Sequence, residues 1–127
     1  GAWILEKFHG WADLRTKSLK EVYGYDDLIT NIMLYILTNS FNTASWIYFG
    51  RREEGGRVMN FDGGKINVPT ACALYPKELL SWPPKSYVDR LYNVVQWNEY
   101  PSGGHFAALE EPNFLIKDIK NFFKKLK

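Results

Sequence analysis

The sequence predicts an α/β fold whose sheet is incomplete. Residues 66–74 and 92–97 are short apolar runs typical of buried parallel strands, and residues 83–91 between them have the length of one crossover helix. An amphipathic helix follows over residues 111–127, and helical segments precede the first strand. Because two parallel strands do not complete a sheet, we expect the closing end of a larger fold.

The composition is that of a globular domain. Of the 127 residues, 46% are hydrophobic and 24% are charged, which excludes a disordered tail. The net charge of +2 is far from the basic excess of a nucleic-acid-binding protein, so no nucleic-acid partner is expected. Cys72 is the single cysteine, which excludes an intrachain disulfide and favours a reducing, cytoplasmic compartment. No apolar run reaches the roughly 20 residues that span a bilayer, so no membrane anchor is predicted.

Residues 1–64 predict a helical region. Apolar side chains recur at near-helical spacing over residues 2–13 and indicate a first helix, which a polar stretch at residues 14–24 follows. Later in this region, residues 42–49 predict another helix. Residues 51–64 then become polar and glycine-rich, as in an exposed loop.

The helix predicted over residues 26–39 differs from a surface helix. Asp26 and Asp27 are placed to cap its N-terminus and to complement its dipole. Its apolar side chains surround nearly the whole helix, so we expect it to be covered from two sides.

Residues 65–127 predict the end of an α/β core. The strand over residues 66–74 lacks charge and is apolar on both faces, but Pro69 has no amide hydrogen to donate. We therefore expect this strand to join the sheet beyond Pro69. The helix over residues 83–91 leads to the strand over residues 92–97, which makes one right-handed βαβ unit.

The last predicted helix, over residues 111–127, has Pro112 in its first turn. Lysines line one face, which indicates a solvated face rather than a membrane-binding one. The opposite, apolar face is predicted to consist of Leu115, Ile119, Phe122, Phe123 and Leu126.

Two ionisable side chains lie where parallel sheets gather their catalytic groups. Glu78 follows the first strand, and His105 lies in a glycine-flanked loop after the second. Because the carboxyl ends of adjacent parallel strands meet at one edge of a sheet, we expect these side chains to lie close together. A carboxylate that accepts from one imidazole nitrogen leaves the other nitrogen to take a proton. This pair would be the base half of a catalytic triad.

The residues around His105 carry a specific pattern. The string GGHFAALEEP at residues 103–112 resembles the histidine motif that closes the α/β-hydrolase enzymes, and its form is most similar to that of the epoxide hydrolases. AWILEKF at residues 2–8 and DDLITNIMLY at residues 26–35 resemble segments of the microsomal and juvenile-hormone epoxide hydrolase branch.

The resemblance covers nearly the whole chain and is weakest over residues 14–25 and 50–65. It implies the C-terminal part of an α/β-hydrolase fold. Residues 1–64 would then be part of the helical lid, and residues 65–127 would be the closing end of the core.

The same resemblance implies roles for individual residues. In the context YPKE, Glu78 would be the acid, and His105 would activate the water that hydrolyses a covalent ester. Tyr48 would be a lid tyrosine that donates a hydrogen bond to the oxygen of a small apolar epoxide, although Tyr35 is also available and Gly50 departs from the charged residue expected there. The product would be a vicinal diol, and no metal or organic cofactor is implied.

The sequence also departs from the family. The chain begins at Gly1 without Met, and no nucleophile elbow precedes Glu78. The nucleophilic aspartate, the His-Gly-x-Pro oxyanion segment and the first lid tyrosine are expected upstream. We therefore expect a C-terminal fragment that needs an N-terminal remainder as its partner and is inactive alone. Four aspartates are instead interpreted as helix caps or solvated loop charges: Asp13, Asp26, Asp27 and Asp62. The second histidine, His9, is interpreted as a surface or packing residue.

Two alternatives remain open at this stage. An esterase or a haloalkane dehalogenase of the same fold also ends in an acid and a histidine. Tyr48 discriminates because an epoxide needs an acid for its leaving oxygen and a halide does not. A binding module without activity is the other alternative. A half-sheet of this kind would expose an apolar edge, so self-association is expected if the chain stands alone.

Overall fold

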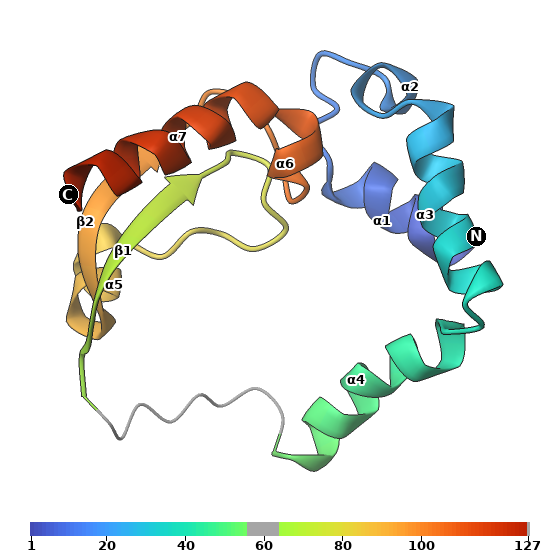
Figure 1. Cartoon of the computed structure of the whole chain (residues 1–127), viewed down its shortest axis with the longest axis horizontal. Coiled ribbons are helices and arrows are strands. Elements are labelled where there is room, and N and C mark those ends of the chain that lie inside the picture. The colour runs from blue at the N-terminus through green and yellow to red at the C-terminus, as the bar shows by residue number, and fades with distance from the viewer. Residues whose placement is uncertain (56–63, 127) are drawn as a thin grey trace.

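The computed structural model describes residues 1–55 and 64–126. Its elements are α1 (Ala2–Trp11), α2 (Leu19–Val22), α3 (Tyr25–Leu37), α4 (Phe41–Glu53), β1 (Ile66–Leu74), α5 (Lys85–Leu91), β2 (Tyr92–Glu99), α6 (Ala107–Glu110) and α7 (Pro112–Lys125). The helices before β1 lie on one side of the molecule, and the strands with α5 and α7 lie on the other (Figure 1). No helix within the described residues has both the length and the apolar character needed to cross a bilayer. Most of the loop predicted at residues 51–64 lies outside the described residues, and α4 takes up its beginning.

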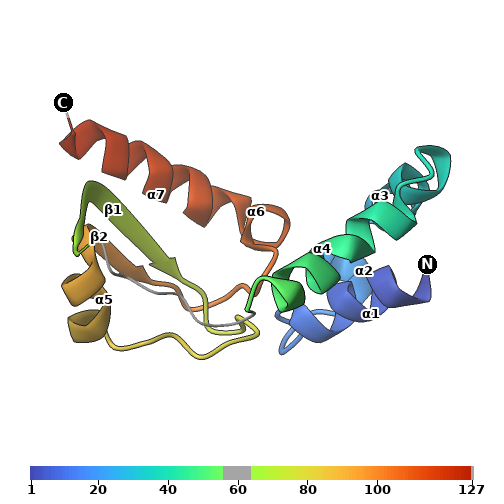
Figure 2. The same cartoon turned by 90° about the horizontal axis from the view of Figure 1, so that it is seen from below.

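The strands β1 and β2 are parallel neighbours joined by α5, which confirms the predicted βαβ arrangement. The helices α5 and α7 lie on opposite faces of the pair (Figure 2). The prediction that the first strand joins the sheet only beyond Pro69 is wrong, because Ile66 already pairs with Tyr92 and Pro69 pairs with Asn93. The register shifts between Ile66 and Pro69, where the proline cannot donate to the ladder. The sheet formed by the described residues has two strands, so the prediction of an incomplete sheet is confirmed. The expected burial of the first strand is wrong for its first half, where Val68 is 68% exposed because the described residues supply no cover.

A small aromatic core holds the helical side together. Ile4 and Phe8 of α1 are buried with Tyr23 and Leu28, and Phe106 from the loop after β2 packs against them. The rings of Phe8 and Phe106 stack with their centroids 4.5 Å apart. This stack joins the helical side to the strand side, next to the predicted histidine.

The stretch at residues 14–24 is more structured than its polarity predicts. Ser18 and Glu21 form a capping box that begins α2, in which the Glu21 carboxylate accepts the main-chain N–H of Ser18 at 2.7 Å. The turn that ends α2 places Tyr23 in the core, where it is 1% exposed. Burial raises the pKa of the Tyr23 hydroxyl, which lies near Glu110.

The helix α3 corrects two predictions. Gly24 is its N-cap, and Asp26 and Asp27 lie in its first turn, where they complement the helix dipole without capping. Among its apolar side chains Leu28 is buried, whereas Ile29 is 56% exposed. The prediction of a helix covered from two sides is therefore wrong for the described residues, because α3 packs on the α1 side and no described element covers its other face.

The helix α7 packs on the strands with a polar residue at its centre. Asp118 is 4% exposed and accepts hydrogen bonds from the Asn98 amide and, at 2.7 Å, from the Tyr100 hydroxyl. Burial and this bond raise the pKa of Tyr100 to about 12. Gln96 donates to the Asp118 carbonyl at 3.1 Å and accepts from Lys125 at 3.0 Å. The predicted apolar face is covered only in part, since three of its members are exposed: Ile119, Phe123 and Leu126.

Candidate active site

The loops that follow β1 and β2 lie side by side at the carboxyl ends of the strands. The main-chain N–H of Lys77 donates to the carbonyl of Gly103 at 3.1 Å, and Lys77 forms a parallel bridge with Gly104. Parallel pairing thus continues beyond both strands. The next residues on the two loops are Glu78 and His105.

The structure brings Glu78 and His105 together. Nδ1 of His105 lies 2.6 Å from Oε1 of Glu78, and the same oxygen accepts the main-chain N–H of Leu79 at 2.7 Å. The side chains of His105 and Glu78 are 36% and 21% exposed, so water can reach the pair. Because the carboxylate engages Nδ1, Nε2 is the nitrogen left to take a proton. This geometry suits a general base, while the catalytic roles of both residues remain predictions.

Two glycines let the histidine loop pass close to its neighbours. Gly103 has a φ of +106°, and a Cβ atom there would lie 2.6 Å from the ring of Tyr75. A Cβ atom on Gly104 would lie 2.5 Å from the main-chain oxygen of Trp11. Gly103 is therefore required by its backbone conformation and by lack of space, and Gly104 is required by lack of space alone.

The segment after α1 anchors the histidine loop. The Asp13 carboxylate accepts the N–H of Gly103 at 3.0 Å and pairs with Arg15 at 2.6 Å, and hydrogen bonds from Arg15 lower the pKa of Asp13 to about 2. Glu110 accepts the N–H of Asp13 at 2.8 Å and that of Phe106 at 2.9 Å. The prediction of a solvated charge at Asp13 is therefore wrong. No local pattern signals this contact, because Gly103 lies 90 residues further along the chain.

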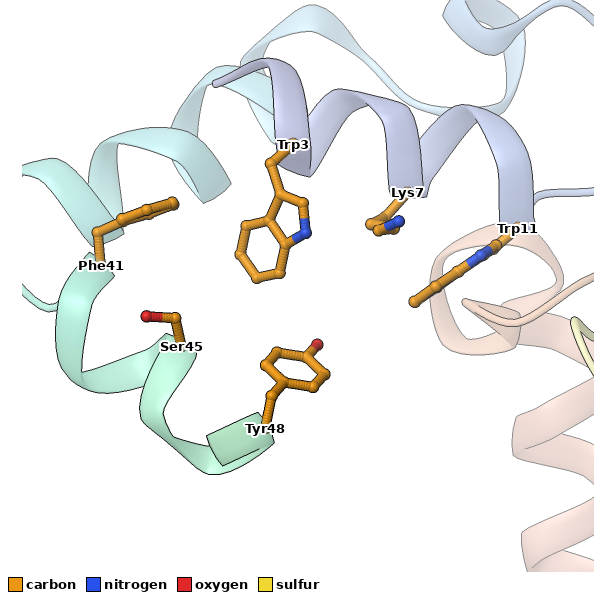
Figure 3. A pocket seen from close by; sticks show the side chains of 6 residues that line it. All are labelled: Trp3, Lys7, Trp11, Phe41, Ser45 and Tyr48. Carbon is orange, nitrogen blue, oxygen red and sulfur yellow. The ribbon is translucent and has the colours of Figure 1, made fainter. Parts of the chain in front are cut away.

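Tyr48 borders a cavity of about 460 Å³ between α1 and α4 (Figure 3). Its ring packs edge-on against Trp3 with the centroids 6.4 Å apart, and its hydroxyl points into the space between the helices. Tyr35, the other available tyrosine, borders a smaller cavity that Tyr48 also lines. The larger cavity is lined by Trp3, Lys7, Trp11, Phe41, Ser45 and Tyr48.

Trp11 connects this cavity to the acid–histidine pair. Its indole lines the Tyr48 cavity and also lies edge-to-face with the His105 imidazole, at a centroid distance of 5.0 Å. Within the described residues no hydrogen bond or ring contact joins Tyr48 directly to His105. The structure therefore brings Glu78 and His105 into contact and leaves Tyr48 on a separate helix. No local pattern in the sequence links Trp11 to His105.

The remaining candidates take no part in this arrangement. His9 is exposed on α1, and Cys72 is half-buried in β1, where burial raises the pKa of its thiol. Asp62 lies outside the described residues. In residues 1–55 and 64–126, no group of three His, Cys, Asp or Glu side chains could hold a metal ion.

The fold and the site together define a class of protein. A βαβ unit, a closing helix on the other face, and an acid–histidine pair over the carboxyl ends of the strands are the features of the closing part of an α/β-hydrolase fold.

Comparisons with known proteins narrow this class. Juvenile hormone epoxide hydrolase 1 of Ctenocephalides felis is 36% identical over 131 residues, a match that covers 99% of the chain and 28% of the relative. Epoxide hydrolase 1 of Sus scrofa is 34% identical over 126 residues, covering 95% of the chain and 28% of the relative. The crystal structure of juvenile hormone epoxide hydrolase from the silkworm Bombyx mori superposes with a TM-score of 0.80 and 30% identity, covering 98% of this chain and 32% of that one. No family model matches.

The chain is therefore a homologue of the epoxide hydrolases of the α/β-hydrolase superfamily, as its motifs predicted. It spans about 28% of the length of these curated relatives.

Proposed function

We propose that this chain supplies the water-activating half of an epoxide hydrolase together with one lid tyrosine. Residues 1–64 would contribute to the lid, and residues 65–127 would form the closing end of the core. The nucleophilic aspartate would come from sequence upstream of Gly1, so the 127-residue chain would not turn over an epoxide by itself.

The reaction would proceed in two steps. In the first, an aspartate oxygen attacks an epoxide carbon, the ring C–O bond breaks, and the oxygen that leaves takes a proton from the Tyr48 hydroxyl. In the second, Nε2 of His105 removes a proton from water as the water attacks the ester carbonyl. The ester C–O bond then breaks, and the diol oxygen that leaves takes the proton held by the His105 imidazolium. The aspartic acid formed in this way loses its proton and the Tyr48 phenolate regains one, so that all three groups return to their starting states. Glu78 would hold the imidazole in the required tautomer and stabilise the imidazolium.

One observation supports this proposal above the others. The 2.6 Å contact between Nδ1 of His105 and Oε1 of Glu78 lies over the carboxyl ends of two parallel strands, where α/β enzymes place their chemistry. A carboxylate at this distance directs Nε2 away from itself and holds the imidazole in the tautomer that leaves Nε2 free to take a proton.

The test of this role is His105→Gln in the protein that carries this sequence, with styrene oxide as substrate. Glutamine cannot act as a base, so the aspartyl ester should form at a near-native rate and then persist, detected as a mass increase of one substrate. His9→Gln is the matched control, because His9 is exposed and has no place in the mechanism. Normal diol turnover by the His105→Gln variant would refute the proposal.

A second variant tests the choice of substrate class. Tyr48→Phe removes the hydroxyl that would protonate the epoxide oxygen and keeps the ring packed on Trp3. Ester formation should slow by about tenfold to a hundredfold, while hydrolysis of the ester should stay within about twofold of native. Unchanged ester formation from styrene oxide would contradict this role of Tyr48, and ester formation from a haloalkane would instead favour a substrate whose leaving group needs no proton.

A further inference from the structure

The imidazole of His105 is confined by two aromatic rings. The indole of Trp11 meets it at a centroid distance of 5.0 Å and an interplanar angle of 77°, and the ring of Phe106 meets it at 5.1 Å and 80°. Trp11 and Phe106 are themselves stacked at 6.2 Å and 23°. The imidazole is therefore perpendicular to a stack of two nearly parallel rings, a favourable arrangement for aromatic pairs.

Trp11 also holds the main chain of the same residue. The N–H of His105 donates to the Trp11 carbonyl at 2.9 Å, and Gly104 packs against that carbonyl so closely that a Cβ atom would lie 2.5 Å from it. The hydrogen bond from the His105 N–H uses the main-chain oxygen of residue 11, so a change of side chain at this position keeps it as long as the backbone does not move. A variant of the indole therefore separates the effect of the ring from the anchoring of the loop.

The contact with Glu78 alone does not fix the imidazole plane. A single hydrogen bond restrains the position of Nδ1 more than the tilt of the ring, and the side chain is 36% exposed. The two aromatic rings restrict this tilt, so they help to determine where Nε2 points. A base misplaced by about 1 Å can lose a hundredfold in rate, so such restriction matters for catalysis.

The other contacts of the indole place it between two parts of the site. Trp11 lines the cavity that Tyr48 borders, and the ammonium group of Lys7 lies 5.2 Å from the centroid of its indole (Figure 3). We propose that Trp11 is a positioning residue that holds the imidazole of His105 in its water-activating orientation from the wall of the Tyr48 cavity. The kinetic part of this inference rests on the proposed epoxide hydrolase function.

The proposal predicts a split between the two chemical steps. In the protein that carries this sequence, Trp11→Leu should slow hydrolysis of the aspartyl ester by about tenfold or more and leave ester formation within about twofold of native. With styrene oxide, kcat should therefore fall while kcat/KM is nearly constant. Trp11→Phe keeps an aromatic ring and should restore most of kcat. Trp46→Leu is the matched control, because Trp46 is 63% exposed on α4 and has no ring contact with the histidine loop.

A spectroscopic measurement on the protein that carries this sequence tests the ring contact without any turnover. The imidazole proton signals of His105 are assigned by their loss in His105→Gln, and Trp11→Leu should shift them through the loss of the indole ring current while those of His9 stay in place. Equal loss of kcat and kcat/KM, or unmoved His105 signals in a folded Trp11→Leu variant, would overturn the proposal. Normal turnover by His105→Gln would instead overturn the proposed function, and the imidazole signals would still decide the role of Trp11.

Discussion

The two sides of the candidate site are built differently. His105 is fixed by the carboxylate of Glu78, by the Trp11 carbonyl and by its ring contacts, in a loop that hydrogen bonds tie to residues far along the chain. Tyr48 lies on α4, is 62% exposed, and packs mainly through an edge contact with Trp3. The base side, which is the histidine loop with its neighbours, is thus preorganised. The lid side, which is Tyr48 on α4, has few packing contacts among the described residues. Substitutions should therefore be costly on the base side and mild on the lid side.

The largest effect is expected from Gly103→Ala on the base side. Alanine disfavours the φ of +106°, and its Cβ would lie 2.6 Å from the Tyr75 ring, so the free energy of unfolding should fall by about 3 kcal/mol. Urea unfolding followed by tryptophan fluorescence measures this change. A loss below about 1 kcal/mol would show that the histidine loop is less constrained than its contacts indicate.

Asp118→Ala should have the next largest effect, because it leaves two half-buried donors without their acceptor. The Asn98 amide and the Tyr100 hydroxyl both donate to this carboxylate. We expect a loss of about 2–3 kcal/mol in the free energy of unfolding, again from urea titration. The exposed Asp26→Ala is the control and should change stability by less than about 0.5 kcal/mol.

Asp13 should make the base side sensitive to acid. Its pKa is lowered from 3.8 to about 2, so its stabilising contribution is complete above the unfolded-state value and is lost as the pH falls from about 4 to 2. At neutral pH, Asp13→Asn should cost about 1–2 kcal/mol, since the half-exposed Arg15 weakens the pair. The difference between native protein and variant should shrink below pH 4 in thermal unfolding scans. A difference that is constant down to pH 2 would contradict this assignment.

The smallest effect, and one of opposite sign, is expected on the lid side. Gly50 lies within α4, and a Cβ atom there would meet nothing within 4 Å. Gly50→Ala should therefore stabilise the protein by about 0.5–1 kcal/mol through helix propensity alone. A destabilising Gly50→Ala in the protein that carries this sequence would show that α4 is packed more closely there than the described residues show.

The sequence predicts most of the elements because each depends on local periodicity. The apolar runs at residues 66–74 and 92–97 and the amphipathic pattern that begins at Pro112 all correspond to elements of the structure. The proximity of Glu78 and His105 also follows from sequence, because adjacent parallel strands bring their following loops together.

What the sequence does not predict depends on contacts between distant residues. Asp13 meets Gly103 and Trp11 meets His105 across the whole chain, and no periodic pattern marks either pair. The burial of Asp118 is not predicted, because an acid on the inner face of α7 is stable only where other residues donate hydrogen bonds to it. Here the donors, Asn98 and Tyr100, come from β2 and the loop after it. The exposed apolar face of α3 illustrates a second limit. The spacing of its apolar residues predicts that these side chains are buried, but it does not identify the element that covers them.

The most direct test of the account locates the covalent ester. The protein that carries this sequence, as its His105→Gln variant, would be incubated with styrene oxide, digested and mapped by peptide mass spectrometry. The account predicts one substrate adduct on an aspartate outside these 127 residues. An adduct on Asp13 or any other residue of this chain, or continued diol formation without an adduct, would contradict it.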